Sequence, residues 1–276
     1  SHIHFADGTI YAPTVFGSTD STTGEWQINA APTFTPGNNG FTILKDGNTI
    51  TDQSANSNDF SLTSGTLLKS EDCPSNVYAT LNSLDSDLTA SDKFEYGNTK
   101  VNGQTPADRK YYCSLTMGFQ GNGKYYFEGI MLSNAKGYLG LTSLDALQDP
   151  SFHRHHNEYC GRYDYDYGYN FEDSQMYKNT SGTAYSSTSW SANDYFSFAI
   201  DNTNQKMYIA KNGSWINSAN PSSGTGGFDY SAIGNNVMFI ITDNTASNYN
   251  KFAFNFGNGS INGAAISPTY SPTVGD

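Results

Sequence analysis

Apolar and polar residues alternate along much of this chain, with the period of two that is typical of β-strands. The alternation is clearest in residues 194–201 and 205–211, which a short polar turn separates and which Asn212 and Gly213 follow. Two alternating runs around a turn predict an antiparallel hairpin, and the Asn-Gly pair predicts a second tight turn directly after it.

A second apolar run, residues 123–132, has apolar side chains on both of its faces, which predicts a central strand covered by a second sheet. Residues 120–123 favour a hairpin turn that joins this run to residues 111–119. Residues 85–109 are polar, and we expect a surface loop there. Further strands are predicted at residues 41–45, 59–62, 77–81, 237–242 and 252–256.

Helical spacing of apolar residues does not persist for a dozen positions anywhere, and the best candidate is one turn at residues 144–147. We therefore expect an all-β fold, an antiparallel β-sandwich. With 276 residues the chain has room for one large β domain. The predicted division is an extended N-terminal arm at residues 1–40, the sandwich at residues 41–259 and a C-terminal tail at residues 260–276.

Glycine and proline interrupt the arm too often for a long regular element. Its apolar residues are spaced as anchors, which suits docking on a neighbouring subunit, and packing on the chain's own sandwich is an equally good interpretation. The chain does not begin with methionine, so we expect a processed or excerpted piece of a longer protein. The anchor residues are Ile3, Phe5, Ile10, Tyr11, Phe16 and Trp26.

The net charge is −12 and the basic residues are scattered, so the surface repels phosphate backbones and we expect no nucleic-acid partner. Divalent cations could still bridge the chain to an anionic glycan. No apolar run approaches the roughly 20 residues that a membrane span needs, so we expect no membrane insertion. Cys73, Cys113 and Cys160 are too few and too far apart for a disulfide framework and favour free thiols, although one bridge would fit their number.

The most unusual segment, residues 152–177, is rich in tyrosine and histidine. If residues 163–170 form a strand, four tyrosines share one of its faces, where they could stack on sugar rings or a protein partner; the alternative is that they cover the domain's own core. Trp190 and Trp215 lie beside predicted strand ends, where aromatic rings favour binding, and core packing of at least one is the alternative. The four tyrosines are Tyr163, Tyr165, Tyr167 and Tyr169.

Oxygen-bearing side chains occupy the opposite face of the same predicted strand. Asp164, Asp166 and Asn170, with Asp173 after them, offer the carboxylate and amide oxygens that Ca²⁺ prefers. A calcium ion is therefore a candidate cofactor, and the alternative is that these side chains are simply solvated.

Three histidines lie before this predicted strand. His153, His155 and His156 could contact a ligand or, together with Glu158 or Cys160, bind a transition metal, because imidazole and thiolate suit zinc and nickel. A surface loop without a metal is the alternative interpretation.

Four segments, in this order, resemble the signature of SPRY domains: residues 123–128, 138–141, 194–201 with 207–213, and 254–257. The resemblance implies a concanavalin-like β-sandwich that binds proteins, peptides or glycans through its loops and has no catalytic activity. The tyrosine-rich segment falls in a variable part of the SPRY pattern, so specific recognition is expected there first.

Segments on both sides resemble large virion proteins of tailed phages, especially phages of marine bacteria and cyanobacteria. The resemblance implies a non-enzymatic, homo-oligomeric protein at the virion surface, in a tail fibre or another appendage. Its arm would contact other virion proteins, and its sandwich would bind a host-surface glycan or protein. A capsid-decorating or connector protein without a receptor role is the alternative. The segments are residues 5–8, 16–17, 23–26, 39–41, 73–82 and 218–221.

Concanavalin-like folds include glycanases, whose retaining members resemble one another in a Glu-x-Asp-x-x-Glu strand with two carboxylates about 5 Å apart. No glutamate of this chain begins such a run, and neither a G-x-S-x-G elbow nor a glycine-rich phosphate loop occurs. Glu128, in the predicted central strand, is expected to be partly buried and hydrogen-bonded in a structural role. We expect no enzymatic activity, and a polysaccharide depolymerase is the least favoured alternative.

Overall fold

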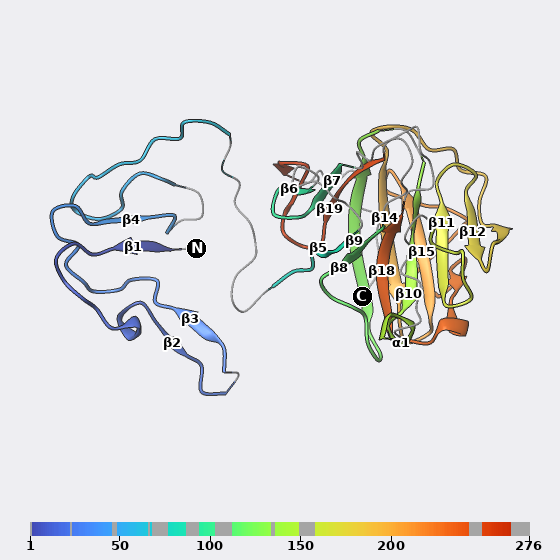
Figure 1. The fold of residues 1–276 in the computed structure, drawn as a ribbon, viewed down its shortest axis with the longest axis horizontal. Coiled ribbons are helices and arrows are strands. Elements are labelled where there is room, and N and C mark those ends of the chain that lie inside the picture. The colour runs from blue at the N-terminus through green and yellow to red at the C-terminus, as the bar shows by residue number, and fades with distance from the viewer. Residues whose placement is uncertain are drawn as a thin grey trace. The chain divides into compact units, whose positions relative to one another are not determined.

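The computed structural model describes residues 2–22, 24–45, 49–65, 67, 77–86, 94–102, 112–133, 136–148, 158–242 and 250–265. The chain divides into two compact units, residues 1–78 with 258–260 and residues 79–257 with 261–276 (Figure 1). In the described ranges, helix is limited to α1 (Leu144–Gln148) and two 3₁₀ helices, Pro13–Val15 and Ser231–Ile233. The all-β prediction and its single helical turn are confirmed. None of the described helices is long and apolar enough to cross a membrane.

The first unit contains two small antiparallel sheets: β1 (Ile3–Phe5) pairs with β4 (Phe41–Ile43), and β2 (Gly17–Thr19) pairs with β3 (Trp26–Ile28). The sequence predicts that the sandwich starts at residue 41, whereas in the structure residues 41–78 belong to the first unit. β4 belongs to the first unit because it pairs with β1, with Phe5 stacked on Phe41 at 5.5 Å between ring centroids. The predicted strand at residues 59–62 is irregular chain.

The second unit contains two larger antiparallel sheets within the described residues. Seven strands lie in the order β13 (Ser181–Ala184), β12 (Gln175–Lys178), β11 (Asp166–Asn170), β10 (Tyr138–Ser143), β18 (Val237–Thr242), β8 (Tyr112–Leu115) and β5 (Leu81–Ser86). The eight-stranded sheet has the order β16 (Ser214–Trp215), β15 (Lys206–Lys211), β14 (Tyr195–Asp201), β9 (Lys124–Met131), β19 (Lys251–Asn255), β7 (Lys100–Asn102) and β6 (Phe94–Glu95), and β17 (Phe228–Asp229) also pairs with β15. A separate pair joins β20 (Ser260–Ile261) to β21 (Ala264–Ala265).

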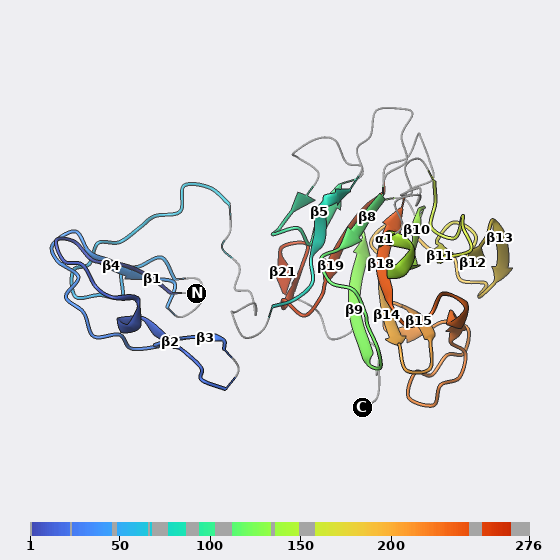
Figure 2. The same cartoon turned by 60° about the horizontal axis from the view of Figure 1, so that its bottom comes forward.

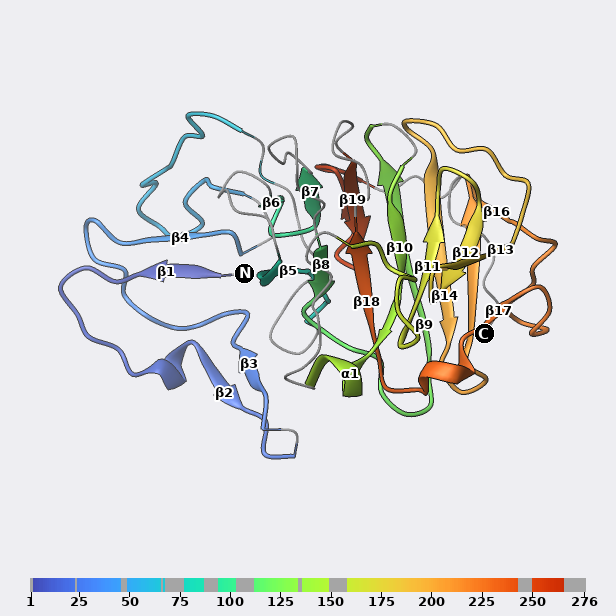
Figure 3. The same cartoon turned by 45° about the vertical axis from the view of Figure 1, so that its right-hand side comes forward.

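The two large sheets pack against each other (Figure 3), and aromatic side chains from both of them form the core between them. The ring of Phe127 in β9 lies 5.6 Å from Phe198 in its own sheet and 4.7 Å from Phe239 in β18 of the other sheet. All three side chains are buried. The second unit is thus an antiparallel β-sandwich, and β9 is the central strand that its two apolar faces predict, between β14 and β19.

The connections between strands follow the prediction only in part. β14 and β15 form the predicted hairpin, and the turn into β16 has the positive φ values at Asn212 (46°) and Gly213 (79°) that such a turn requires. The predicted hairpin of residues 111–119 with β9 is wrong, because β8 and β9 lie in different sheets. The surface loop predicted at residues 85–109 is also wrong in part, since it contains the end of β5, the strand β7 and the edge strand β6.

Candidate functional site

Tyr163 and Tyr165 lie in a turn directly before β11, not in the strand that the sequence predicts. Asp166 fixes this turn, because its carboxylate accepts hydrogen bonds from the N–H groups of Gly161 (3.0 Å) and Tyr163 (3.1 Å). The two tyrosine rings stack with their centroids 5.0 Å apart and an interplanar angle of 16°. Burial first, and nearby acidic groups second, raise the pKa of both hydroxyls. The pair is a small, half-buried aromatic surface.

The other two tyrosines of the predicted row lie in β11 and are buried. Tyr167 contacts Phe228 and has the Lys178 ammonium 4.8 Å from its ring centroid. Tyr169 accepts a hydrogen bond from the Trp190 indole N–H at 2.9 Å. All five residues of β11 are buried, so the strand has no exposed face on which four rings could gather. The structure therefore places two of the tyrosines at the surface and two in the interior.

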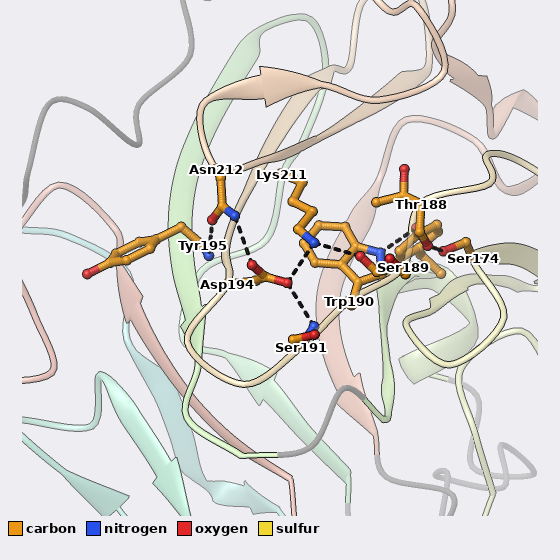
Figure 4. A network of polar contacts seen from close by, with 10 residues as sticks. Ser174, Thr188, Ser189, Trp190, Ser191, Asp194, Tyr195, Lys211 and Asn212 are labelled. Carbon is orange, nitrogen blue, oxygen red and sulfur yellow. Dashed lines mark hydrogen bonds and ion pairs between the residues drawn. The ribbon is translucent and has the colours of Figure 1, made fainter.

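Trp190 lies in a polar network beside the ends of β14 and β15 (Figure 4). The Lys211 ammonium pairs with the Asp194 carboxylate at 2.7 Å, donates to the Ser189 carbonyl at 2.6 Å, and lies 5.6 Å from the Trp190 ring centroid. Asn212 donates to the second Asp194 oxygen at 2.8 Å. Desolvation alone would raise the pKa of Asp194, but these hydrogen bonds and the Lys211 charge outweigh it and lower that pKa. The network holds a buried indole, so its evident role is to fix residues 189–194 on the sandwich.

Trp215 occupies the short edge strand β16 and is partly exposed. Its ring meets the buried ring of Tyr208 edge-on, with 6.4 Å between centroids. Of the two predicted tryptophans, Trp215 is the one whose ring a partner could reach without rearrangement.

Three of the four residues predicted to bind calcium accept hydrogen bonds from protein donors. Asp164 is exposed in the turn, whereas Asp166 is buried and holds the turn together. Asn170 accepts a backbone N–H from the residue two positions later. Asp173 accepts the Tyr177 hydroxyl at 2.6 Å, which together with burial raises the pKa of Tyr177 to about 12. The described ranges contain no group of three histidine, cysteine or acidic side chains able to hold a metal ion.

The predicted histidine site, with His153, His155 and His156, falls in residues 149–157, which lie outside the described ranges, so it stays a prediction. Cys160 is described and is a buried free thiol, as is Cys113. Burial raises the pKa of both thiols, which makes them unreactive.

Two features of the second unit escape the sequence reasoning. One is the Asp194–Lys211 ion pair, which the sequence could have indicated. Asp194 begins the first strand of the predicted hairpin and Lys211 ends the second, and a hairpin brings such positions together. The other is the exposed edge strand β13, which has no apolar alternation to mark it. Glu128, by contrast, is buried and accepts the Tyr126 hydroxyl at 2.5 Å, as predicted.

Comparison with known proteins gives structural likeness only. No protein-family model matches the chain, and no curated protein matches its sequence. Among similar solved structures is the SPRY domain of human HERC1, with 11% identity over 64% of this chain and 98% of that chain and a TM-score of 0.47. A second human SPRY domain has 12% identity over 60% of this chain and 96% of that chain and a TM-score of 0.43. The β-sandwich assignment itself rests on the two packed sheets, and the chain is similar in fold to these SPRY domains.

Proposed function

We propose that this chain is a non-enzymatic virion protein of a tailed phage, a module of a tail fibre or another appendage at the virion surface. In this proposal the first unit binds other virion proteins, including further copies of the chain, and the sandwich binds a host-surface glycan or protein. The phage-like segments in residues 5–8 and 73–82 support the proposed origin from a tailed phage. The SPRY-like order of residues 123–257 supports a binding module without catalysis.

The observation that carries the proposal is the exposure of apolar side chains in the first unit. Among the described residues of this unit, Ile43 is the only buried hydrophobic side chain. Ile10 is 99% exposed, and Phe5 and Phe60 are 48% and 46% exposed. Phe5 and Phe60 both pack on Phe41 and so belong to one contiguous apolar surface, the kind that marks a protein–protein interface in soluble proteins. The unit is therefore suited to being covered by a neighbour.

The β1–β4 pair gives this exposed surface its shape. Ile3 lies opposite Ile43, and Phe5 lies opposite Phe41, so the four side chains share one face of the two-stranded sheet. On this face Ile3 and Phe5 are exposed, whereas Phe41 is half-buried and Ile43 is buried. Phe60 extends the face by packing on Phe41 at 4.7 Å between ring centroids. A two-stranded sheet is marginal in water by itself, so a neighbouring virion protein that covers this face would stabilise it.

The receptor role is supported by the stacked pair of Tyr163 and Tyr165. Two half-buried rings with hydroxyl rims can stack on the apolar faces of sugar rings or pack against a protein loop. The turn is fixed before any ligand arrives, because Asp166 holds its backbone. Such preorganisation reduces the entropy that binding would otherwise cost.

A glycan array, combined with competition for phage adsorption to host cells, tests the receptor role on the purified chain. We expect the wild type to bind and to compete. The double variant Tyr163→Ala/Tyr165→Ala should lose about tenfold in affinity, and Tyr96→Ala, at a residue that is 50% exposed in a different turn, should retain it. A wild-type chain that neither binds nor competes refutes the receptor role.

The second candidate is a capsid-decorating or connector protein without a receptor role, and the apolar face of β1 and β4 favours it equally. Imaging of the whole particle separates the two candidates. Density on the head surface, with the first unit enclosed by neighbours and with no adsorption competition by the purified chain, would support the second. Density at the tip of an appendage would support the first.

A further inference from the structure

The edges of the two large sheets differ in how well they are protected against pairing with another chain. Unpaired edge strands template such pairing, and proteins limit it by short strands, bulges and charged residues. β6, β16 and β17 have two residues each. β5 pairs with β8 through a shifted register and carries Asp85. These edges are therefore poor templates.

β13 is the remaining edge in the described part of the sandwich, and it has none of these protections. It lies at the end of the seven-stranded sheet beyond β12, and no described strand pairs with its outer side (Figure 2). Its four residues, Ser181 to Ala184, continue the ladder with β12 without a bulge. All four are exposed, and none is charged or a proline. The strand thus presents a regular backbone to solvent.

The composition of β13 indicates what kind of strand would pair with it. Receptors that bind a foreign peptide by strand addition read its sequence through pockets for alternate side chains. Ser181, Gly182, Thr183 and Ala184 are too small to form such pockets. Pairing at this edge would depend on backbone hydrogen bonds and on the absence of repulsion. An identical uncharged strand meets both conditions, which matters in a chain of net charge −12 whose copies otherwise repel one another.

We infer that two copies of this chain associate through antiparallel pairing of their β13 strands, which joins the two seven-stranded sheets into one continuous sheet. A two-fold axis perpendicular to the sheet relates the copies. This symmetry puts the two Thr183 side chains on the same face, directly opposite each other or on the diagonal, about 5–8 Å apart. The contact is small, so this interface is weak on its own. It contributes more where other contacts already hold copies of the chain close together. The inference does not depend on the receptor role of the sandwich.

Charge complementation at Thr183 tests the pairing in the full chain. Like charges on opposed strands are destabilising, so Thr183→Lys and Thr183→Glu should each raise the dissociation constant about fivefold in sedimentation analysis. An equimolar mixture of the two variants should associate at least as tightly as the wild type. Ala192→Lys, at an exposed position in the loop before β14, should leave the association unchanged.

Hydrogen exchange supplies a second measurement. The β13 amides should become more protected as the wild-type concentration rises, and the Thr183→Lys variant should not show this change. Identical sedimentation of the wild type and both charged variants, or β13 exchange that is independent of concentration, overturns the inference. Association through the first unit alone would survive both charged variants, so it is distinguished from pairing at β13.

Discussion

Replacing Asp52 with asparagine should loosen the loop that follows β4 in the first unit. The Asp52 carboxylate accepts hydrogen bonds there from the N–H groups of Thr42 (2.8 Å), Ser54 (2.8 Å) and Asn58 (2.9 Å) and from the Ser54 hydroxyl (2.8 Å). Asparagine keeps one acceptor oxygen but turns an NH₂ group toward two of these donors, and that group cannot accept. The variant would leave buried or half-buried donors without a partner.

The pKa of Asp52 gives the size of the effect. Desolvation on its own would raise this pKa, but the hydrogen bonds outweigh it and lower the pKa from 3.8 to about 2. A difference of that size is linked to at most about 2.5 kcal/mol of stability. Because the loop lies near the surface, where water screens the charge, we reduce the expected contribution to about 1 kcal/mol. Folding lowers the pKa, so the contribution is complete above about pH 4 and is lost as the pH falls through about 2.

Hydrogen exchange of the full chain measures this locally. At pH 6, the amides of Thr42, Ser54 and Asn58 should lose about fivefold in protection in Asp52→Asn, which corresponds to about 1 kcal/mol. Between pH 5 and pH 2, their protection in the wild type should fall, and in the variant it should change much less. Unchanged protection in the variant at pH 6, or a flat wild-type profile down to pH 2, would refute the reasoning.

Asp59→Asn is the matched control. Asp59 is exposed and accepts a hydrogen bond from the Asp52 N–H at 2.8 Å, an interaction that asparagine can keep through its remaining oxygen. Its effect on the same amides should be within about twofold, since exposed positions of this kind contribute little. A control variant as damaging as Asp52→Asn would mean that the loop responds to any charge change nearby and not to the Asp52 acceptor geometry.

Three further predictions concern the sandwich. The Cβ of Gly140→Ala would overlap the Tyr167 carbonyl oxygen and crowd the Cys160 sulfur, so chemical denaturation should show a loss of about 3 kcal/mol, and an unchanged midpoint would contradict the packing. Lys211→Met removes the ion pair that lowers the pKa of Asp194, so thermal unfolding should show lower stability at pH 7 and a smaller loss between pH 4 and pH 2 than in the wild type. Cys160 should resist iodoacetamide at pH 8 in the folded protein and react in urea, as peptide mass spectrometry would show.

The local sequence pattern was sufficient to predict strand pairing where a strand and its partner are close in the sequence. The β14–β15 hairpin and the turn at Asn212 and Gly213 follow from alternation and turn chemistry, and the structure confirms them. The same local reasoning fails for β8 and β9, because both are apolar strands joined by a short Gly-rich segment, which fits a hairpin and a crossing between sheets equally well. The choice depends on which strands are free to pair, and β9 pairs with β14 and β19, which are far away in the sequence.

The tyrosine segment shows why the candidate site could be predicted only in part from the sequence. Alternation predicts that Tyr163 to Tyr169 share one face, but that requires the strand to begin at residue 163. Asp166 instead bonds back to the N–H groups of Gly161 and Tyr163, so the strand begins at residue 166. A carboxylate that folds back on its own turn leaves no periodic trace in the sequence, and the burial of Tyr167 and Tyr169 depends on neighbouring strands.

Hydrogen bonds from polar side chains order the backbone of the first unit. This explains how the unit can be ordered while its apolar side chains are exposed. The side-chain amides of Asn56 and Asn58 donate to the Gly40 carbonyl at 2.9 Å each, and Asn39 donates to Asp7 at 2.8 Å. These bonds, together with those to Asp52, hold the loops in place, and none of them uses the apolar side chains on the face of β1 and β4. A partner would then meet an apolar face that is already arranged, so little ordering entropy opposes assembly. If acid weakens the Asp52 loop, assembly through this face should weaken at a pH where the sandwich, which is held by its aromatic core, remains folded.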